Sequence, residues 1–354
     1  MIRPIFNKRI TIIMRQTVYS LTKTSLFSLL VSVPIWACNA SHVMGAGGAG
    51  AVYTMSADTM ERGGVYIGIN REYIGNRSLS DNAIIDAIEG GAEHLHSIDA
   101  TDNYSLSLSY GLSDRLTLNI NLPYVIRWNI RAGELHDEGM GLAGEVHAHG
   151  DIGGLGDLSI LVQYKVYDNS HTKVALLGGL KLPTGKSDLK EGDEAIEADL
   201  QPGSGSWDYF AGVALTHEFE DFSFHASTLY KYNTEGVEES RLGDIFTYNA
   251  AIAFHLMGAM HTHNGIQEEH HGTVDYSVDC FAELNGEIAE PDSFGGKDAQ
   301  NTGHHLLYFT TGLQLLTQSE YSAFVSFSVP LYQHFKGLQN DIRYKASIGI
   351  GRHF

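Results

Sequence analysis

Residues 104–124 read YSLSLSYGLSDRLTLNINLPY, and this stretch decides the fold. Leucine, isoleucine and tyrosine take every second position on both sides of Ser113 and Asp114, with mostly serine, threonine and asparagine between them. A period of two predicts strands whose side chains alternate between two faces, and the short turn predicts an antiparallel hairpin. One face is apolar with aromatic residues near its ends, and the other is small and polar.

The same alternation recurs in segments of roughly ten residues, the length of strand that crosses a bilayer at a tilt. The further segments are 65–74, 158–166, 174–182, 207–219, 222–232, 246–256, 274–284, 307–315, 321–331 and 342–350. With the hairpin they make about twelve strands. The predicted fold class is therefore all-β, a transmembrane antiparallel up-and-down β-barrel with lipid outside and a polar lumen inside.

The connections between these segments alternate between short and long. Short periplasmic turns alternating with longer extracellular loops are typical of outer-membrane barrels. Segments 127–156 and 183–206 are expected to be long loops, and 83–90 a short helical piece. The long connection from Gly258 to Gly272 breaks the rhythm. A soluble secreted β-protein would also alternate apolar and polar residues along its strands. Its exposed face, however, is usually richer in lysine and glutamate than the polar face of the strands predicted here.

The amino-terminal segment has the composition of a secretory signal peptide. It is basic, contains an apolar core from Leu26 to Ala37, and fits cleavage after Ala40, with Met1 and Met14 as candidate starts. We therefore expect a signal peptide at 1–40, a periplasmic arm or lumen plug at 41–62, and the barrel at 63–354.

The formal charge is −19, and removing 1–40 would make it −24 because that segment holds five basic and no acidic residues. So acidic a chain is unsuited to nucleic acid, which needs a basic face. Cys280 would be the only cysteine left, which excludes an intrachain disulfide in the mature protein.

Charged residues on the polar parity are candidates for lining a pore, because opposed charges set the selectivity of channels. They are Lys165, Lys173, Lys181, Lys231, Arg343, Lys345, Asp208, Glu218, Asp275, Asp279 and Glu283. The alternative is that they form ion pairs which merely fill a narrow lumen.

Histidines gather in the predicted connections, at 94 and 96, at 136, 147 and 149, and at 261, 263, 270 and 271. No fixed ligand spacing accompanies them, so we expect solvated loop histidines and no metal or cofactor. Were a metal bound, the second loop would be the first choice, because its histidines stand near Asp137, Glu138, Glu145 and Asp151. Ser105, Ser107, Ser109, His225 and His255 share the polar parity, but nothing fixes a catalytic geometry, so no enzymatic activity is predicted.

Three stretches resemble the family described as a putative MetA-pathway of phenol degradation. They are GLGDLSILVQYK at 154–165, LPTGKSD at 182–188 and LQPGSGSWDY at 200–209, and their spacing also fits. The resemblance implies an outer-membrane channel or transporter, with hydrophobic or aromatic compounds among its candidate solutes, and it supplies no catalytic residues.

The function expected from these features is a channel or transporter in the outer membrane that passes small solutes through a charged, polar lumen. Its partners would be membrane lipid, the solute, and the barrel-assembly machinery through the terminal strand that ends at Phe354. The alternative is a closed binding or structural barrel whose acidic, histidine-rich loops capture cations or partners.

Overall fold

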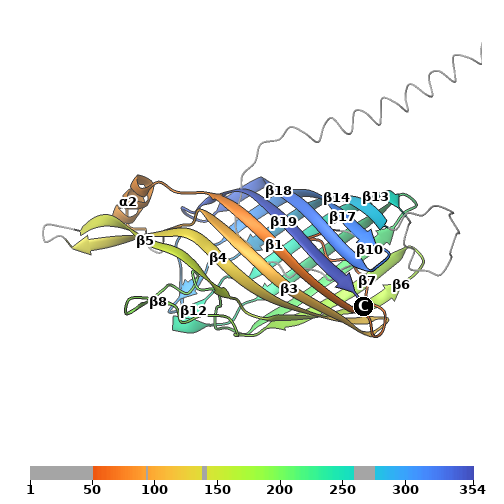
Figure 1. Ribbon diagram of the computed structural model, residues 1–354. Helices are drawn as coiled ribbons and strands as arrows, with labels where there is room; N and C mark the ends of the chain where they lie inside the picture. Colours follow the sequence, from red (N-terminus) through yellow and green to blue (C-terminus); the bar gives the residue numbers. More distant parts are fainter. Residues whose placement is uncertain (1–50, 93–94, 138–141, 259–275) are drawn as a thin grey trace, which may run out of the picture. The chain divides into compact units, whose positions relative to one another are not determined.

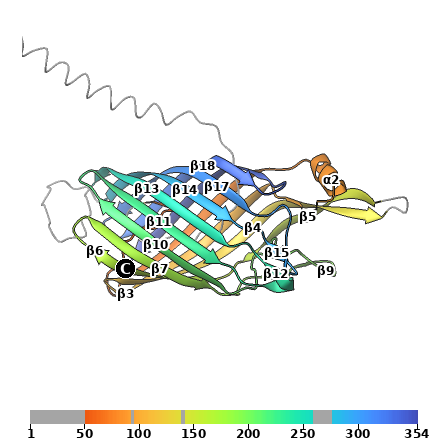
Figure 2. The ribbon, with the colours of Figure 1, turned by 180° about the vertical axis from the view of Figure 1, so that it is seen from behind.

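The computed structural model describes residues 51–92, 95–137, 142–258 and 276–354, all within one compact unit, Trp36–Phe354. Strands dominate it, as Figure 1 and, from behind, Figure 2 show. None of the helices in these ranges is long and apolar enough to span a bilayer. The predicted signal peptide, residues 1–40, lies outside the described residues.

Twelve antiparallel strands pair in sequence order around a closed ring. The ring closes because β1 pairs with both β3 and β19. The strands are β1 (Val65–Arg77), β3 (Ala100–Ser113), β4 (Leu116–Asp137), β6 (Ser159–Asp168), β7 (Thr172–Lys181), β10 (Asp208–Glu218), β11 (Phe222–Tyr232), β13 (Ile245–Gly258), β14 (Tyr276–Ala289), β17 (His304–Thr317), β18 (Tyr321–Phe335) and β19 (Asp341–His353). This confirms the predicted fold class.

The two faces of each strand divide as the sequence predicts. In the β3–β4 hairpin, Leu106 pairs with Leu122 and is 47% exposed, whereas the neighbouring Ser105 is 8% exposed. Asparagine, serine and threonine are buried inside the ring, and leucine, isoleucine and aromatic residues cover its outside. A closed barrel with an apolar outer surface needs lipid around it, so the predicted place in the outer membrane is confirmed by this fold.

Aromatic side chains collect near both ends of the outer surface. Tyr209 and Tyr232 are exposed near the ends of β10 and β11 that carry the long connections, and Phe219 and Tyr276 near the other end. Two aromatic girdles of this kind mark the levels of the lipid headgroups.

The two ends of the barrel differ in the length of their connections. The end with the tight turns, where β1 starts and β19 finishes, is here called the short-turn end, and the opposite end is called the long-loop end.

Residues 127–156 form a hairpin, not the loop that the sequence indicated. β4 runs on to Asp137 and pairs with β5 (Leu142–Leu155) and with β2 (His96–Ser97). Helix α2 (Asp81–Glu89), at the predicted helical piece, covers one face of this hairpin (Figure 1). A Cβ on Gly133 would lie 2.6 Å from side-chain atoms of Ile84 and Ile88, so glycine at this position leaves room for the helix.

Other short elements lie in the connections at the long-loop end. They are β8 (Lys190–Glu191), β9 (Glu194–Ala195), η1 (Val237–Glu239), β12 (Ser240–Arg241), β15 (Ser293–Phe294) and β16 (Lys297–Asp298). The connection predicted at 258–272 falls on residues 259–275, outside the described ranges apart from Gly258, as does the predicted strand start at 274.

One inward position was predicted wrongly. The alternation put Arg343 on the same face as Lys345, but the pairing of β1 with β19 shifts register between Gly75 and Asn76. Ile342 is consequently buried, with Ile74 and Leu306, and Arg343 is exposed. A β-bulge reverses the parity of every residue beyond it, and alternation alone cannot reveal it.

Candidate functional site

The candidate site is the lumen, and residues 51–62 (the arm) pass through it. The carboxylate of Glu283, on β14 and 1% exposed, accepts hydrogen bonds from three successive arm amides. The amides of Val52, Tyr53 and Thr54 lie 2.7, 3.2 and 2.8 Å from its oxygens. Backbone donors converging on a buried carboxylate form strong, charge-assisted bonds, so Glu283 fixes the start of the described arm.

Further polar groups of the wall bind the arm along its length. Tyr53 Oη donates to Glu72 at 2.5 Å, and Lys173 Nζ lies 2.6 Å from Asp58 Oδ1. Gln163 Nε2 donates to the carbonyls of Ser56 and Asp58, both at 2.8 Å. The arm is therefore held from several sides of the ring.

Apolar side chains on the inner wall also contact the arm. Met55 and Ala57 pack in one buried cluster whose wall members are Leu161, Ala175, Leu177, Phe210 and Ala214. Val52 packs against Ala253 and Phe281 in a second cluster. Apolar side chains on the inner face of the strands are unfavourable against water, so they indicate a segment inside the barrel. A lumen plug was one of the two possibilities expected for residues 41–62, although these inward apolar residues were not among its grounds.

The arm leaves the lumen over the rim at the short-turn end. A Cβ on Gly111 would lie 1.9 Å from the Glu61 carbonyl oxygen, so only glycine allows the chain to cross there. Gly63 N donates to Gly111 O at 2.8 Å, and the chain then enters β1.

At the long-loop end, the connection between β7 and β10 folds inward (the lumen loop, residues 198–204). Arg127 Nη1 donates to the carbonyls of Leu200 and Gln201, at 3.1 and 3.4 Å. Asp157 accepts from Gly185 N and Ser204 N, both at 2.9 Å. The two stretches that resemble the phenol-degradation family at 182–188 and 200–209 thus meet at Asp157, which belongs to the third.

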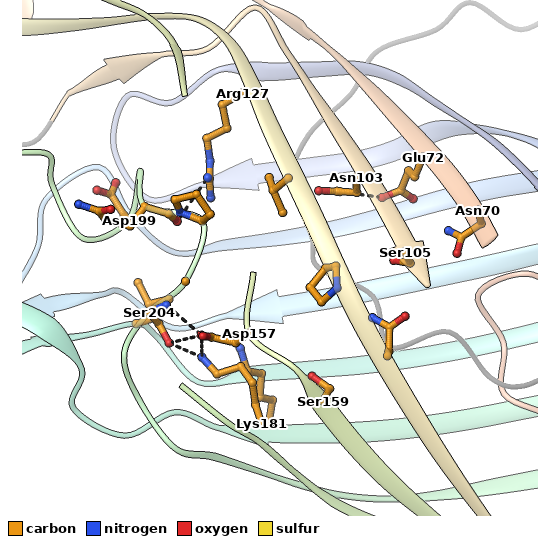
Figure 3. Close-up of a pocket in the computed structure, with 18 of the residues that line it drawn as sticks. Asn70, Glu72, Asn103, Ser105, Arg127, Asp157, Ser159, Lys181, Asp199 and Ser204 are labelled. Carbon is orange, nitrogen blue, oxygen red and sulfur yellow. Dashed lines mark hydrogen bonds and ion pairs between the residues drawn. The ribbon is translucent and has the colours of Figure 1, made fainter. Parts of the chain in front are cut away.

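A cavity of about 160 Å³ lies between the arm and the lumen loop (Figure 3). Its lining includes Val52 and Tyr53 of the arm and most residues of the lumen loop. The wall between them presents polar groups such as Asn70, Glu72 and Ser105, together with Phe210. Cavities of about this volume accept a benzene-sized molecule.

Charges predicted from the alternation form a chain on one side of this cavity. Lys181 Nζ lies 3.0 Å from Asp157 and 2.6 Å from Asp208, and Lys231 Nζ lies 3.4 Å from the same Asp208 oxygen. Lys181 and Lys231 line the cavity. The structure therefore brings three of the predicted residues together with Asp157, which the sequence reading left out.

The remaining predicted residues are distributed toward the ends of the barrel. Lys173 pairs with Glu218 at 2.6 Å, Lys165 with Asp168 at 2.6 Å, and Asp279 with His255 at 2.8 Å. Lys345 is buried, with its Nζ 4.2 Å from the centroid of the Tyr308 ring. Asp275 lies outside the described residues.

His225, an inward histidine on β11, lies within hydrogen-bonding distance of two hydroxyl groups. His225 Nε2 lies 2.9 Å from Ser223 Oγ, and its Nδ1 lies 3.1 Å from Thr216 Oγ1. Thr216 Oγ1 in turn accepts from the amide of Ala57. His225 thus contributes to the seat of the arm.

His96, in β2, ties the lumen loop region to the outer hairpin. Its Nε2 lies 2.8 Å from Glu197 and its Nδ1 3.6 Å from Asp199. Burial alone would lower the pKa of His96, but Asp199 and Glu197 outweigh burial and the nearby Arg127 and raise that pKa above its usual value. Protonated His96 therefore holds both carboxylates.

Two groups of three imidazole and carboxylate side chains lie close enough together to hold one metal ion among the described residues, His96 with Glu197 and Asp199, and Glu134 with His136 and His147. The second lies on the β4–β5 hairpin, in the segment favoured for a metal by the sequence. Positions 94, 261, 263, 270 and 271, which also carry predicted loop histidines, lie outside the described residues, as does Glu138.

Comparison with solved structures supports the fold alone. The crystal structure of the COG4313 outer membrane channel from Pseudomonas putida F1 is 13% identical, with a TM-score of 0.55, and the match covers 84% of this chain and 98% of that one. The NanC porin (9% identical, TM-score 0.40, 81% and 98% covered) and the CymD monoaromatic hydrocarbon channel (11%, 0.39, 83% and 89%) are weaker likenesses. No curated protein matches the chain.

A family model matches the sequence directly. The model described as "Putative MetA-pathway of phenol degradation" matches residues 107–279, which include all three of the stretches quoted above. The resemblance of this chain to that family, predicted from those stretches, is therefore confirmed.

Proposed function

We propose that the protein is an outer-membrane channel for small solutes, closed at rest by its own arm and lumen loop. The observation that carries the proposal is a cavity in the polar lumen that both of these segments line. Neither segment is a strand of the ring, so either can move without breaking the hydrogen bonds that close the barrel. Passage then requires displacing the arm from Glu283 and the lumen loop from Arg127.

The lining suggests the class of solute. Hydrogen-bonding groups such as Asn103 and Asn121 alternate with apolar surfaces from Pro123, Val125 and Phe210. Such a mixed wall suits a small molecule with an apolar body and one or two polar groups. The family's description, which refers to phenol degradation, agrees with an aromatic solute of this kind.

We further propose that the inward charges filter solutes. Lys181 and Lys231 line the cavity and both pair with Asp208, and Lys173 and Glu218 lie toward the short-turn end. We also propose that residues 1–40 are removed as a signal peptide, that the arm is the plug predicted at 41–62, and that the terminal strand ending at Phe354 engages the assembly machinery.

A closed binding barrel is the second candidate, and the density of contacts around the arm favours it. Glu283, Gln163 and Lys173 each bind the arm from a different strand. Liposome swelling separates the two functions, because a folded protein that never admits small solutes is a binding barrel.

Replacing Glu283 by alanine (Glu283→Ala) should loosen the arm. Removing the carboxylate leaves arm amides without acceptors, at a cost of about 1–3 kcal/mol to the closed state, or about a 5- to 150-fold gain in the open population. Single-channel conductance and proteoliposome swelling should both rise. Glu220→Ala, at an exposed carboxylate in the β10–β11 turn, is the matched control and should change neither. Unchanged permeability in both Glu283→Ala and a chain lacking residues 51–60 would refute an occluding arm.

Replacing Lys181 by glutamine (Lys181→Gln) should change the ion selectivity of the channel. Losing this ammonium leaves Asp157 and Asp208 under-compensated, so the reversal potential in a salt gradient should move toward cation selectivity. Lys297→Gln, at an exposed lysine in β16, is the matched control and should not change the reversal potential. An identical reversal potential in the two variants would remove Lys181 from the pathway.

The pH prediction concerns His96. Its pKa is raised in the folded protein, so its contribution to holding the loop is complete below the ordinary histidine value of about 6.5 and is lost as the pH rises through the higher folded pKa. Hydrogen exchange at residues 196–201, corrected for the intrinsic rate, should show more protection at acidic than at basic pH. His96→Gln should abolish the difference, and a difference that survives this change would contradict the assignment.

A further inference from the structure

The β4–β5 hairpin projects from the ring and has a second face that α2 does not cover. Glu134 and His136 lie two residues apart on β4, on one face of that strand. His147 lies on β5, opposite Ala132 and two residues along from the partner of Glu134. The side chains of Glu134, His136 and His147 are 51%, 49% and 38% exposed.

Their ligand atoms converge on one point. The Nε2 atoms of His136 and His147 lie 2.9 Å apart, and Glu134 Oε2 lies 3.7 and 3.8 Å from them. Bonds of about 2.0–2.2 Å in a tetrahedral zinc site put neighbouring ligand atoms roughly 3.3 Å apart. The observed separations bracket that value, so small side-chain movements suffice to seat an ion.

We propose that Glu134, His136 and His147 form a binding site for a divalent transition-metal ion at the long-loop end of the barrel. Two imidazoles and one carboxylate suit zinc, copper or nickel better than calcium or magnesium, which prefer oxygen ligands. Three protein ligands leave a fourth position open to water or to a group on an arriving molecule. The site is separate from the lumen and stands whether or not the channel proposal does.

The local charge favours a cation there. Glu145 pairs directly with Glu134 across the hairpin and is exposed, which adds a second carboxylate beside the site. The whole chain is also acidic, with a formal charge of −19. A negative surface raises the local concentration of divalent cations and speeds their capture.

The other imidazole–carboxylate group has a different geometry. Glu197 and Asp199 approach opposite ring nitrogens of His96, so a single ion at one nitrogen would not serve both carboxylates through the contacts seen. The Arg127 charge also acts on His96, which disfavours a cation. The His96 group therefore acts as a proton-dependent tie for the loop region, and the hairpin group is the metal site.

The test titrates the detergent-solubilised full chain with Zn²⁺ and counts bound ions per chain. The double variant His136→Ala/His147→Ala should bind one ion fewer than the unaltered protein. His171→Ala, at an exposed histidine in the β6–β7 turn at the other end, is the matched control and should lose none. Heat-modifiable gel mobility confirms that each variant has folded.

A second readout maps the site directly. Diethyl pyrocarbonate modifies free imidazoles, and mass spectrometry locates the products. Zn²⁺ should protect His136 and His147 from modification but should not protect His171. Equal zinc stoichiometry in the double variant and the control, or equal modification of His136 and His147 with and without Zn²⁺, would overturn the proposal.

Discussion

The backbone hydrogen bonds between β1 and β19 close the sheet, and everything else in the molecule depends on that closure. An open sheet would expose unpaired amides and carbonyls at its edges, which lipid cannot satisfy. Once the ring is closed, the alternation of side chains has a physical meaning on each side. Leu106 and Leu108 meet hydrocarbon, and Ser105 and Ser109 are enclosed. The ring also creates a lumen whose polar groups need partners, and the arm and the lumen loop supply many of them.

The interior combines two kinds of contact that differ in how easily they are released. Met55 and Ala57 pack on apolar wall residues, a non-directional attraction that tolerates sliding. The bonds from three amides to Glu283 are directional and are lost together when the arm moves. Glu283 thus holds the start of the described arm, Gln163 and Lys173 hold it farther along, and the apolar clusters add contacts between them. At the long-loop end, Asp157 accepts a hydrogen bond from Ser204 of the lumen loop and also pairs with Lys181 of the barrel wall. The lumen loop and the charged residues of the wall are therefore connected through Asp157.

The strands and their faces could be predicted because alternation is local and each segment carries its own evidence. The antiparallel pairing of β3 with β4 follows from the short turn, although a bulge between Gly111 and Ser113 sets its final register. Three features could not be predicted in that way. The bulge that exposes Arg343 depends on the neighbouring strand, and the hairpin at 127–156 depends on α2 packing over Gly133. The convergence of Glu283 on the arm joins residues 231 positions apart, and only Leu161, Phe210 and Phe281 on the inner parity hinted at it.

The central claim is that the apolar parity faces lipid and the polar parity faces an enclosed interior. Nitroxide labels placed singly at residues 104–112 of β3, in a protein reconstituted in lipid vesicles, test it most directly. Even-numbered positions should show high collision rates with oxygen, which concentrates in hydrocarbon, and odd-numbered positions low rates, giving a period of two along the strand. Equal oxygen accessibility at both parities, or the reverse alternation, would contradict the account.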